Sequence, residues 1–500
     1  MKDVNRTPAS WALMILFLVT GAQPVEAAVQ VVDLRDEHDM TIDGAYRYDH
    51  AGTSVGSAGD VNGDGVGDVI VGTSDIAGRR NFGRAYVLFG PLGNEVDLRH
   101  LGDDGFRIKA SGSGDFTGRA VAGAGDVNGD GLDDVIVGAP WADFRARINS
   151  GSAYVVFGKA DTVAVHLDDL DAGGYRIDGA GDHHYAGSAV SGIGDVNGDG
   201  LSDVVLGAPL ASENGRDYSG SAYVVFGQAA SDVIDLRNLG DTGYRIDGSA
   251  PESTTGWSVS GAGDVNGDNK NDLVVGAPAT YFDKRGASYV VFGGGPSADI
   301  DLASLGARGF KIAGVSAEDS FGRAVSGGGD VNGDGLDDVL IGAPTKSASG
   351  REDSGAAFVI FGRSETTKVR ASALESDGYR IKGARRFERA GAAVSMADDI
   401  NGDGRDETVV GAPFASYNGR IESGSAYVVK GKRSNSSLDL RTLHKGYRVD
   451  GEARNDLFGW SVSGLPDIGG DRLGDFIGGA IEATQRDRPS SGAAYIVQAP

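Results

Sequence analysis

The sequence predicts an all-β fold: a seven-bladed β-propeller built from four-stranded antiparallel blades, with the ring closed by an N-terminal strand. Three observations predict it. One pattern recurs seven times, and its acidic centre starts at Asp60, Asp126, Asp195, Asp264, Asp330, Asp399 and Asp467. The intervals of 66, 69, 69, 66, 69 and 68 residues are typical of repeat architectures, in which neighbouring units share one core. Each unit also contains four short strand-like segments.

The unit at residues 243–293 shows these four segments in order. Residues 243–248 (GYRIDG) and 256–263 (GWSVSGAG) alternate between apolar and polar residues, as half-buried strands do. Residues 272–278 (DLVVGAP) form a continuous apolar run that a proline ends, and residues 286–293 (GASYVVFG) are rich in Tyr, Val and Phe. Segments such as DLRNLG (235–240) fit either a single helical turn or a tight connection.

The two ends of the repeat region predict ring closure. Residues 40–44 (MTIDG) match the YRIDG segment of later units, while the last unit stops after GAAYIVQAP (492–500) and lacks its own copy. We therefore expect the N-terminal strand to complete the last blade, which removes an open sheet edge. A linear stack is the alternative, but it needs atypical terminal units, and none is visible.

The centre of each repeat, D-x-N-G-D-G-x-x-D, is typical of a calcium-binding loop. The clearest copy lies in FGRAVSGGGDVNGDGLDDVLIGAP (321–344). Carboxylates at positions one, five and nine, an amide oxygen at three and a carbonyl at seven supply the oxygen ligands that Ca²⁺ prefers. An EF-hand is excluded, because it needs a bidentate Glu at position twelve, where these loops have apolar residues or Gly. An acidic turn without metal is the remaining alternative.

Six of the seven loops are expected to bind calcium. In the fourth, Asn269 replaces a turn glycine, and Asn tolerates the left-handed region. The sixth ends in Glu407 instead of Asp, and the seventh (467–475, DIGGDRLGD) lacks the Asn and places Arg472 at the turn, so we expect weak or no binding there. The predicted ligands are Asp60, Asn62, Asp64, Val66, Asp68, Asp126, Asn128, Asp130, Leu132, Asp134, Asp195, Asn197, Asp199, Leu201, Asp203, Asp264, Asn266, Asp268, Lys270, Asp272, Asp330, Asn332, Asp334, Leu336, Asp338, Asp399, Asn401, Asp403, Arg405 and Glu407.

Residues 1–28 have the features of a secretory signal peptide. Lys2 and Arg6 precede an apolar run of ten residues (11–20), and VEAA (25–28) offers a small-residue cleavage site. No other stretch is apolar enough to cross a membrane, so residues 29–500 are expected to form a single secreted, periplasmic or cell-surface propeller. The chain has no Cys, which makes bound calcium and ring closure the expected substitutes for disulfides. Its formal charge of −25 argues against nucleic acid as a partner.

The repeat resembles the FG-GAP repeat of the integrin α-subunit N-terminal propeller. In the fifth unit the matching residues are Phe321, Gly322, Gly342, Ala343 and Pro344. The resemblance implies a seven-bladed propeller with calcium between the first two strands of a blade, and an adhesion or ligand-binding role. The chain lacks the leg domains, the inserted adhesion domain and the transmembrane helix of integrins, so integrin pairing and signalling do not transfer.

Variable loops between the second and third strands are expected to bind an extracellular protein or glycan, on the face opposite the calcium loops. They contain Arg and aromatic residues, which are frequent in binding hot spots. The candidates are Trp141, Arg145, Arg147, Arg216, Tyr218, Tyr281, Arg285, Tyr417 and Arg420.

The sequence thus favours a monomeric, non-enzymatic binding module with structural calcium. We find no catalytic constellation in it. Two alternatives remain: an exported hydrolase acting on glycans or lipids, and a structural part of an envelope assembly.

Overall fold

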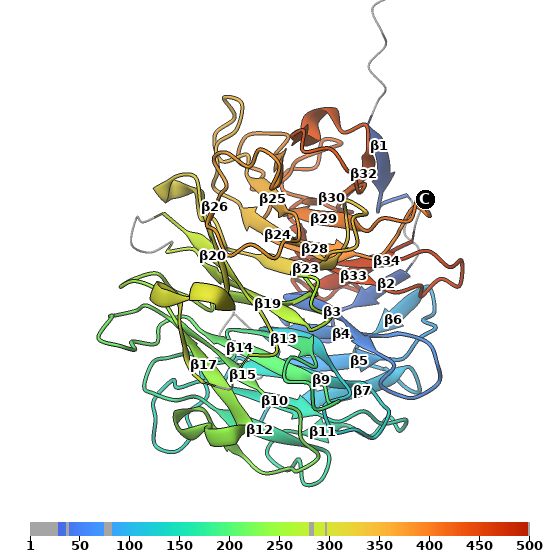
Figure 1. The fold of residues 1–500 in the computed structure, drawn as a ribbon. Helices are drawn as coiled ribbons and strands as arrows, with labels where there is room; N and C mark the ends of the chain where they lie inside the picture. The colour runs from blue at the N-terminus through green and yellow to red at the C-terminus, as the bar shows by residue number, and fades with distance from the viewer. Residues whose placement is uncertain (1–28, 37–39, 75–82, 280–284, 296–297, 499–500) are drawn as a thin grey trace, which may run out of the picture.

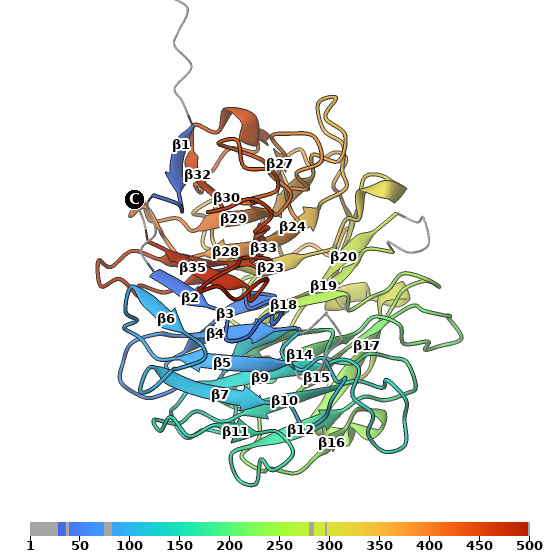
Figure 2. The same cartoon turned by 180° about the vertical axis from the view of Figure 1, so that it is seen from behind.

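A computed structural model describes residues 29–36, 40–74, 83–279, 285–295 and 298–498, which form seven β-sheets arranged as the blades of a closed propeller (Figure 1). The chain runs around the ring, and its N-terminal strands meet its C-terminal strands, as the view from behind also shows (Figure 2). The expected signal peptide, residues 1–28, lies outside the described residues. Within the described ranges, no helix is long and apolar enough to cross a membrane.

Each blade contains four antiparallel strands and a fifth, short strand that pairs in parallel with the fourth. From the innermost strand outward, blades 1 to 3 are β3 (Ser54–Gly59), β4 (Asp68–Thr73), β5 (Arg84–Leu88), β7 (Gly105–Lys109) and β11 (Val165–His166); β8 (Val121–Gly125), β9 (Asp134–Ala139), β10 (Ser152–Val156), β12 (Gly174–Asp178) and β16 (Ile234–Asp235); and β13 (Ala189–Gly194), β14 (Asp203–Ala208), β15 (Ser221–Val225), β17 (Gly243–Asp247) and β21 (Ile300–Asp301).

The remaining four blades repeat this arrangement. Blades 4 and 5 are β18 (Ser258–Gly263), β19 (Asp272–Ala277), β20 (Ala287–Val291), β22 (Gly309–Ala313) and β26 (Val369–Arg370); and β23 (Val325–Gly329), β24 (Asp338–Ala343), β25 (Ala356–Ile360), β27 (Gly378–Lys382) and β31 (Leu438–Asp439). Blades 6 and 7 are β28 (Ala393–Ala397), β29 (Glu407–Ala412), β30 (Ser425–Val429), β32 (Gly446–Asp450) and β1 (Gln30–Asp33); and β33 (Phe458–Leu465), β34 (Asp475–Ala480), β35 (Ala493–Val497), β2 (Met40–Asp43) and β6 (Glu95–Asp97).

The propeller and its four antiparallel strands per blade confirm the predicted fold class. The fifth strand was not predicted. It comes from the DLRNLG-type segment, which makes both a two-residue strand and a short turn: β16 pairs Ile234 with Ile177, and a 3₁₀ turn, η1 (Leu236–Asn238), follows it. Since β16 lies in sequence between two strands of blade 3 but pairs within blade 2, each repeat lends an edge strand to the preceding blade.

The N-terminal region closes the ring at two blades. β2 pairs antiparallel with β35, with Ile42 opposite Ala494, and so completes blade 7 as predicted. β1, which the sequence did not reveal, pairs in parallel with β32 and supplies the outer strand of blade 6. Together the two strands join the start of the chain to its last two blades.

The hydrophobic core lies between blades. Each of seven buried clusters joins side chains of two neighbouring sheets; one of them packs Val87 and Phe106 of blade 1 against Val137 and Tyr154 of blade 2. The second strand of a blade is therefore covered on both faces, and all six residues of β9 are buried. This double burial explains why the second strands are continuous apolar runs.

Candidate metal sites and the opposite face

The acidic loops connect the first strand of each blade to the second, so all seven lie at the same end of the propeller. In blades 1 to 5 the pairing register of the first strand shifts just before the loop, as between Gly327 and Gly329. The sixth loop position has positive φ, with values of 90° at Gly335, 61° at Asn269 and 74° at Arg472. The prediction that Asn269 tolerates this conformation is confirmed.

Loop 5 shows how the nine residues fold around their own carboxylates. Asp330 Oδ1 accepts hydrogen bonds from the backbone N–H groups of Gly333 (2.7 Å) and Asp334 (3.1 Å), and its Oδ2 accepts one from Gly335 (2.8 Å). Asp338 Oδ1 accepts from the N–H of Gly362 (2.8 Å) and its Oδ2 from that of Val331 (3.1 Å). Each carboxylate oxygen has further lone pairs, so these bonds position the oxygens and still leave them able to bind a cation.

The ninth-position carboxylate is buried. Asp338 is 0% exposed, and burial, together with the negative charges of Asp334 and Asp330, raises its pKa to about 8. Burial likewise raises the pKa at this position in the other loops: Asp68 and Asp475 to about 6, and Asp134, Asp203, Asp272 and Glu407 to about 7. A coordinated divalent cation would favour the ionised form of such a carboxylate. The all-oxygen donor set and the excess negative charge fit Ca²⁺.

Loop 6 brings its carboxylates closest together. Oxygens of Asp399, Asp403 and Glu407 lie within 4.8 Å of one another, the only such group of three among the described residues. Calcium–oxygen bonds are about 2.3–2.6 Å long, so ligand oxygens across the ion are up to about 5 Å apart. The additional methylene of Glu407 therefore leaves its carboxylate within reach of an ion that the two Asp residues would share.

Loop 7 keeps the backbone of the other loops without their Asn. Asp467 accepts hydrogen bonds from the N–H groups of Gly470, Asp471 and Arg472, as the first residue does elsewhere. What this loop loses is the amide oxygen at the third position, where Gly469 stands. The prediction that loop 7 binds weakly or not at all stays a prediction.

Neighbouring loops are hydrogen-bonded to one another. In loops 2, 3, 5, 6 and 7 the eighth residue donates its backbone N–H to the carbonyl of the first residue of the preceding loop, as Asp133 does to Asp60 (3.1 Å). Where the eighth residue is Asp, its carboxylate also accepts the N–H of that first residue, as Asp133 Oδ2 does from Asp60 (2.8 Å). The same double contact joins Asp337 to Asp264 and Asp406 to Asp330. The loops thus form linked pairs across blade boundaries.

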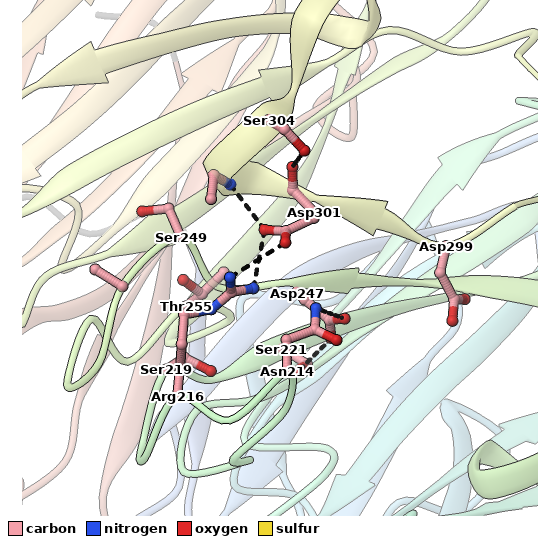
Figure 3. Close-up of polar contacts among 12 residues, drawn as sticks. Asn214, Arg216, Ser219, Ser221, Asp247, Ser249, Thr255, Asp299, Asp301 and Ser304 are labelled. Atoms are coloured by element: carbon pink, nitrogen blue, oxygen red, sulfur yellow. Dashed lines mark hydrogen bonds and ion pairs between the residues drawn. The ribbon is translucent and has the colours of Figure 1, made fainter.

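On the opposite face, three of the candidate ligand-binding arginines have partners inside their own blades. Arg147 makes a two-pronged ion pair with Asp235 (2.8 and 2.9 Å), and Arg216 makes one with Asp301 (3.1 and 2.9 Å), which Figure 3 shows. Arg420 contacts Asp33 at 2.5 Å. Each contact fastens the loop between the second and third strands to the fifth strand, and Arg351 with Asp439 and Arg488 with Asp97 do the same. We call these five contacts the Arg–Asp staples.

The other candidates differ in exposure. Tyr417 is 7% exposed, and its ring lies between the guanidinium groups of Arg385 (3.9 Å) and Arg448 (3.5 Å). Trp141 and Tyr218 are 47% and 49% exposed, Arg285 is exposed, and the half-exposed Arg145 pairs with Asp178. Tyr281 lies outside the described residues. The structure therefore does not gather the nine candidates into one surface, and Trp141, Tyr218, Arg145 and Arg285 remain the accessible ones.

The structure also places a cavity of about 320 Å³ on this face that the loops did not indicate. It adjoins the central channel, because Arg323, Ala392 and Trp460 line both spaces, and the channel is walled by the first strands of all seven blades. These residues occupy the position directly after the dipeptide that corresponds to Phe321-Gly322 in each repeat, as in FGR (321–323), AGA (390–392) and FGW (458–460). The sequence shows that this position varies between repeats. Only the fold, however, brings its seven copies together around one axis, so the sequence alone did not indicate the cavity.

The comparisons with known proteins agree with the repeat. The FG-GAP repeat family matches residues 117–156, 186–225, 255–291, 321–360 and 390–429. Phosphatidylinositol-glycan-specific phospholipase D of Homo sapiens is 28% identical over 429 residues, which cover 78% of this chain and 47% of that protein. Integrin alpha pat-2 of Caenorhabditis briggsae is 30% identical over 249 residues, covering 46% of this chain and 18% of the integrin.

The chain thus spans about half of one relative's length and under a fifth of the other's. Among solved structures, one described as "Structure of Dos1 propeller" has a TM-score of 0.43 and 9% identity, covering 89% of this chain and 81% of that one.

Proposed function

Because this chain is an FG-GAP repeat protein that resembles the integrin α propeller, we propose that it is a calcium-stabilised binding module that works outside the cell. The observation that carries the calcium part is the buried carboxylate at the ninth position of each loop, with a pKa raised to about 8 at Asp338. Such a group is costly to ionise alone and is stabilised by a cation that it shares with the first and fifth positions.

Calcium has a structural role in this proposal. Bound between the first and second strands, it would hold each loop in the conformation that its backbone hydrogen bonds already favour. None of the residues predicted to coordinate calcium lies on the opposite face, where the exposed Trp141 and Tyr218 are found. The metal therefore supports the scaffold, and the opposite face provides the ligand-binding surface.

The test is calcium binding and thermal unfolding of the purified protein, in calcium and in excess EDTA. We expect about six bound ions and a higher melting temperature in calcium, because a ligand that binds only the folded state stabilises it. Asp338→Asn should lower the stoichiometry by one and reduce the stabilisation by calcium, whereas the exposed Asp103→Asn should change neither. Equal melting temperatures in calcium and EDTA would show that the loops are acidic turns without metal.

Export is tested separately. We expect cleavage after Ala27 or Ala28, so the N-terminal sequence of the purified protein should begin at Ala28 or Val29. An intact N-terminus on a protein recovered from the cytosol would contradict the extracellular role.

One finding favours a second candidate, a hydrolase. The similarity to the phospholipase D extends over 78% of this chain. The check is whether the purified chain in calcium releases a phosphatidylinositol-glycan-anchored protein from vesicles. Release above a buffer control would favour the enzyme, and no release alongside saturable ligand binding would favour the binding module.

A further inference from the structure

The cavity on the face opposite the calcium loops has a charge unlike that of the chain. Among the described residues its lining includes three arginines, Arg119, Arg323 and Arg389, and no carboxylate, although the whole chain carries a formal charge of −25. All three arginines are exposed. A concave site lined by one sign of charge concentrates ligands of the opposite sign, so this cavity favours an anionic group.

Aromatic side chains lie beside these arginines. Trp460, which is 37% exposed, and the half-buried Phe414 line the same cavity. The guanidinium of Arg389 lies over the ring of Phe414 (5.0 Å), and that of Arg323 lies over the ring of Trp257 (4.6 Å). Such stacking holds a guanidinium flat, and the planar fork of its N–H groups matches the geometry of an acid group.

The backbone holds this arrangement in place. Ser320 and Arg389 have φ values of 52° and 55°, at corresponding positions just before the first strands of blades 5 and 6. The Thr345 hydroxyl donates its proton to the carbonyl of Glu318 (2.6 Å) and accepts from the hydroxyl of Ser320 (2.9 Å), which ties the wall of the cavity to blade 5. The site therefore stands on a rigid scaffold.

We propose that this cavity binds an acidic saccharide, with the carboxylate or sulfate of one sugar held by Arg323 and Arg389 and its ring packed on Trp460. The inference rests on the proposed binding function and names its ligand class. Planar guanidinium groups match the geometry of carboxylates and sulfates, and an aromatic face suits the apolar face of a pyranose. A volume of about 320 Å³ suits a ligand of one or two sugar rings.

The test is titration calorimetry of the intact protein in calcium, with 3′-sialyllactose, 3′-sulfolactose and lactose as probes. Saturable binding of either acidic probe, with no heat from lactose, is expected. The carboxylate and sulfate arms identify which acid group is preferred. Failure of both acidic probes, or equal binding of lactose, would overturn the proposal.

Matched variants locate the site. Arg323→Gln, Arg389→Gln and Trp460→Ala should each weaken binding by about tenfold or more, because each removes charge-assisted hydrogen bonds or a packing surface. The exposed Arg454→Gln, in the loop that leads to β33, should bind as the parent does. Unchanged affinity in the three cavity variants would overturn the assignment.

Two further measurements separate this inference from the proposed function. If Trp141→Ala abolishes binding and Trp460→Ala does not, the ligand lies on the loops, and the binding module stands without this cavity. The protein has four tryptophans; Trp460 lines the cavity, and Trp257 lies under the guanidinium of Arg323, which lines it too. Ligand should therefore change the tryptophan emission of the parent protein, which tests the site without any variant that has to fold.

Discussion

At the residue scale, the role of a loop arginine depends on the residues that surround it in the fold. Arg216 and Arg420 are surface-loop residues in the sequence, but in the fold each meets an Asp of the fifth strand. Hydrogen bonds between ionised partners are stronger than neutral ones, and the two-pronged geometry also fixes the orientation of the loop. The Arg–Asp staples are therefore structural contacts, and the exposed residues at the axis are better placed to meet a ligand.

Removing a staple should destabilise the protein. For Arg216→Gln we expect a loss of about 1–3 kcal/mol in the free energy of unfolding, because Asp301 loses both of its bonds to the guanidinium. Arg386→Gln is the matched control: it breaks a pair with Glu352 in which both side chains are about 60% exposed, and such pairs contribute little. Denaturant unfolding measures both. Equal losses in the two variants would show that the staples add nothing beyond an ordinary surface pair.

Glu388 makes stability depend on pH. It is 1% exposed, accepts hydrogen bonds from the backbone N–H of Ala384 and the hydroxyl of Tyr427, and burial raises its pKa to about 7. The folded state thus binds its proton more tightly than the unfolded state, in which the pKa is about 4.3. The stability contributed by protonated Glu388 is complete below about pH 4 and is lost as the pH rises through about 7.

Glu388→Gln should remove this dependence. The stability of the variant relative to the parent should rise by about 1–3 kcal/mol between pH 5 and pH 8, because the parent carries a buried charge at pH 8. Thermal unfolding between pH 5 and pH 8 at constant calcium measures the difference, and the exposed Glu352→Gln is the control. A constant difference between parent and variant across this range would contradict the assignment.

At the element scale, several of the acidic loops are held in part by a residue of the next blade. Asp133 belongs to loop 2, yet its carboxylate holds the N–H of Asp60, the first residue of loop 1. A loop is therefore ordered partly by its neighbour. This coupling predicts that residues outside the nine of a given loop influence its affinity for the ion.

Asp133→Ala tests this coupling. It should weaken one calcium site on the order of tenfold while leaving every predicted ligand in place, because it removes a charge-assisted hydrogen bond to the loop backbone. Ser202→Ala is the control: Ser202 holds the same position in loop 3, and its contact with Asp126 is made by its backbone N–H. Calcium titration of both variants measures the affinity of each for the ion. If Ser202→Ala weakens binding as much, the side-chain link is not the cause.

At the scale of the whole molecule, stability depends on a closed ring. Every blade is packed on both faces by a neighbour, and the described residues form seven buried clusters for seven blades. Opening the ring at any interface would expose two such faces to water. The N-terminal strands β1 and β2 are the elements that prevent this.

Deleting residues 29–43 should therefore be severe. The deletion removes all of β2, including the buried Met40 and Ile42, and leaves β35 without its partner. We expect a loss of more than about 5 kcal/mol, from the buried side chains and the lost strand pairing, with exposed apolar surface and association. Deleting residues 29–35 alone, which removes β1 and the Asp33 partner of Arg420, should cost less. Thermal unfolding and gel filtration compare the two, and equal stability of the longer deletion and the parent would contradict closure by β2.

The sequence by itself determined the fold class, the number of blades, the four antiparallel strands and the closure by residues 40–44. This was possible because the recurrence of the pattern marks where each unit begins and ends. In addition, strand alternation, apolar runs and turn glycines indicate strands and turns from neighbouring residues alone. It also located the acidic loops, whose donors are adjacent in the chain. Calcium binding itself and the signal peptide remain predictions.

Only the tertiary structure decided which partners meet across long separations. The staple between Arg420 and Asp33 joins residues 387 apart, β1 pairs with β32, and Asp133 reaches back to loop 1. The cavity at the axis depends on the same effect, because Arg119, Arg323 and Trp460 come from different blades and converge only when the ring closes. Such contacts leave no local pattern, since they depend on the curvature of the ring and on side chains that each repeat is free to vary.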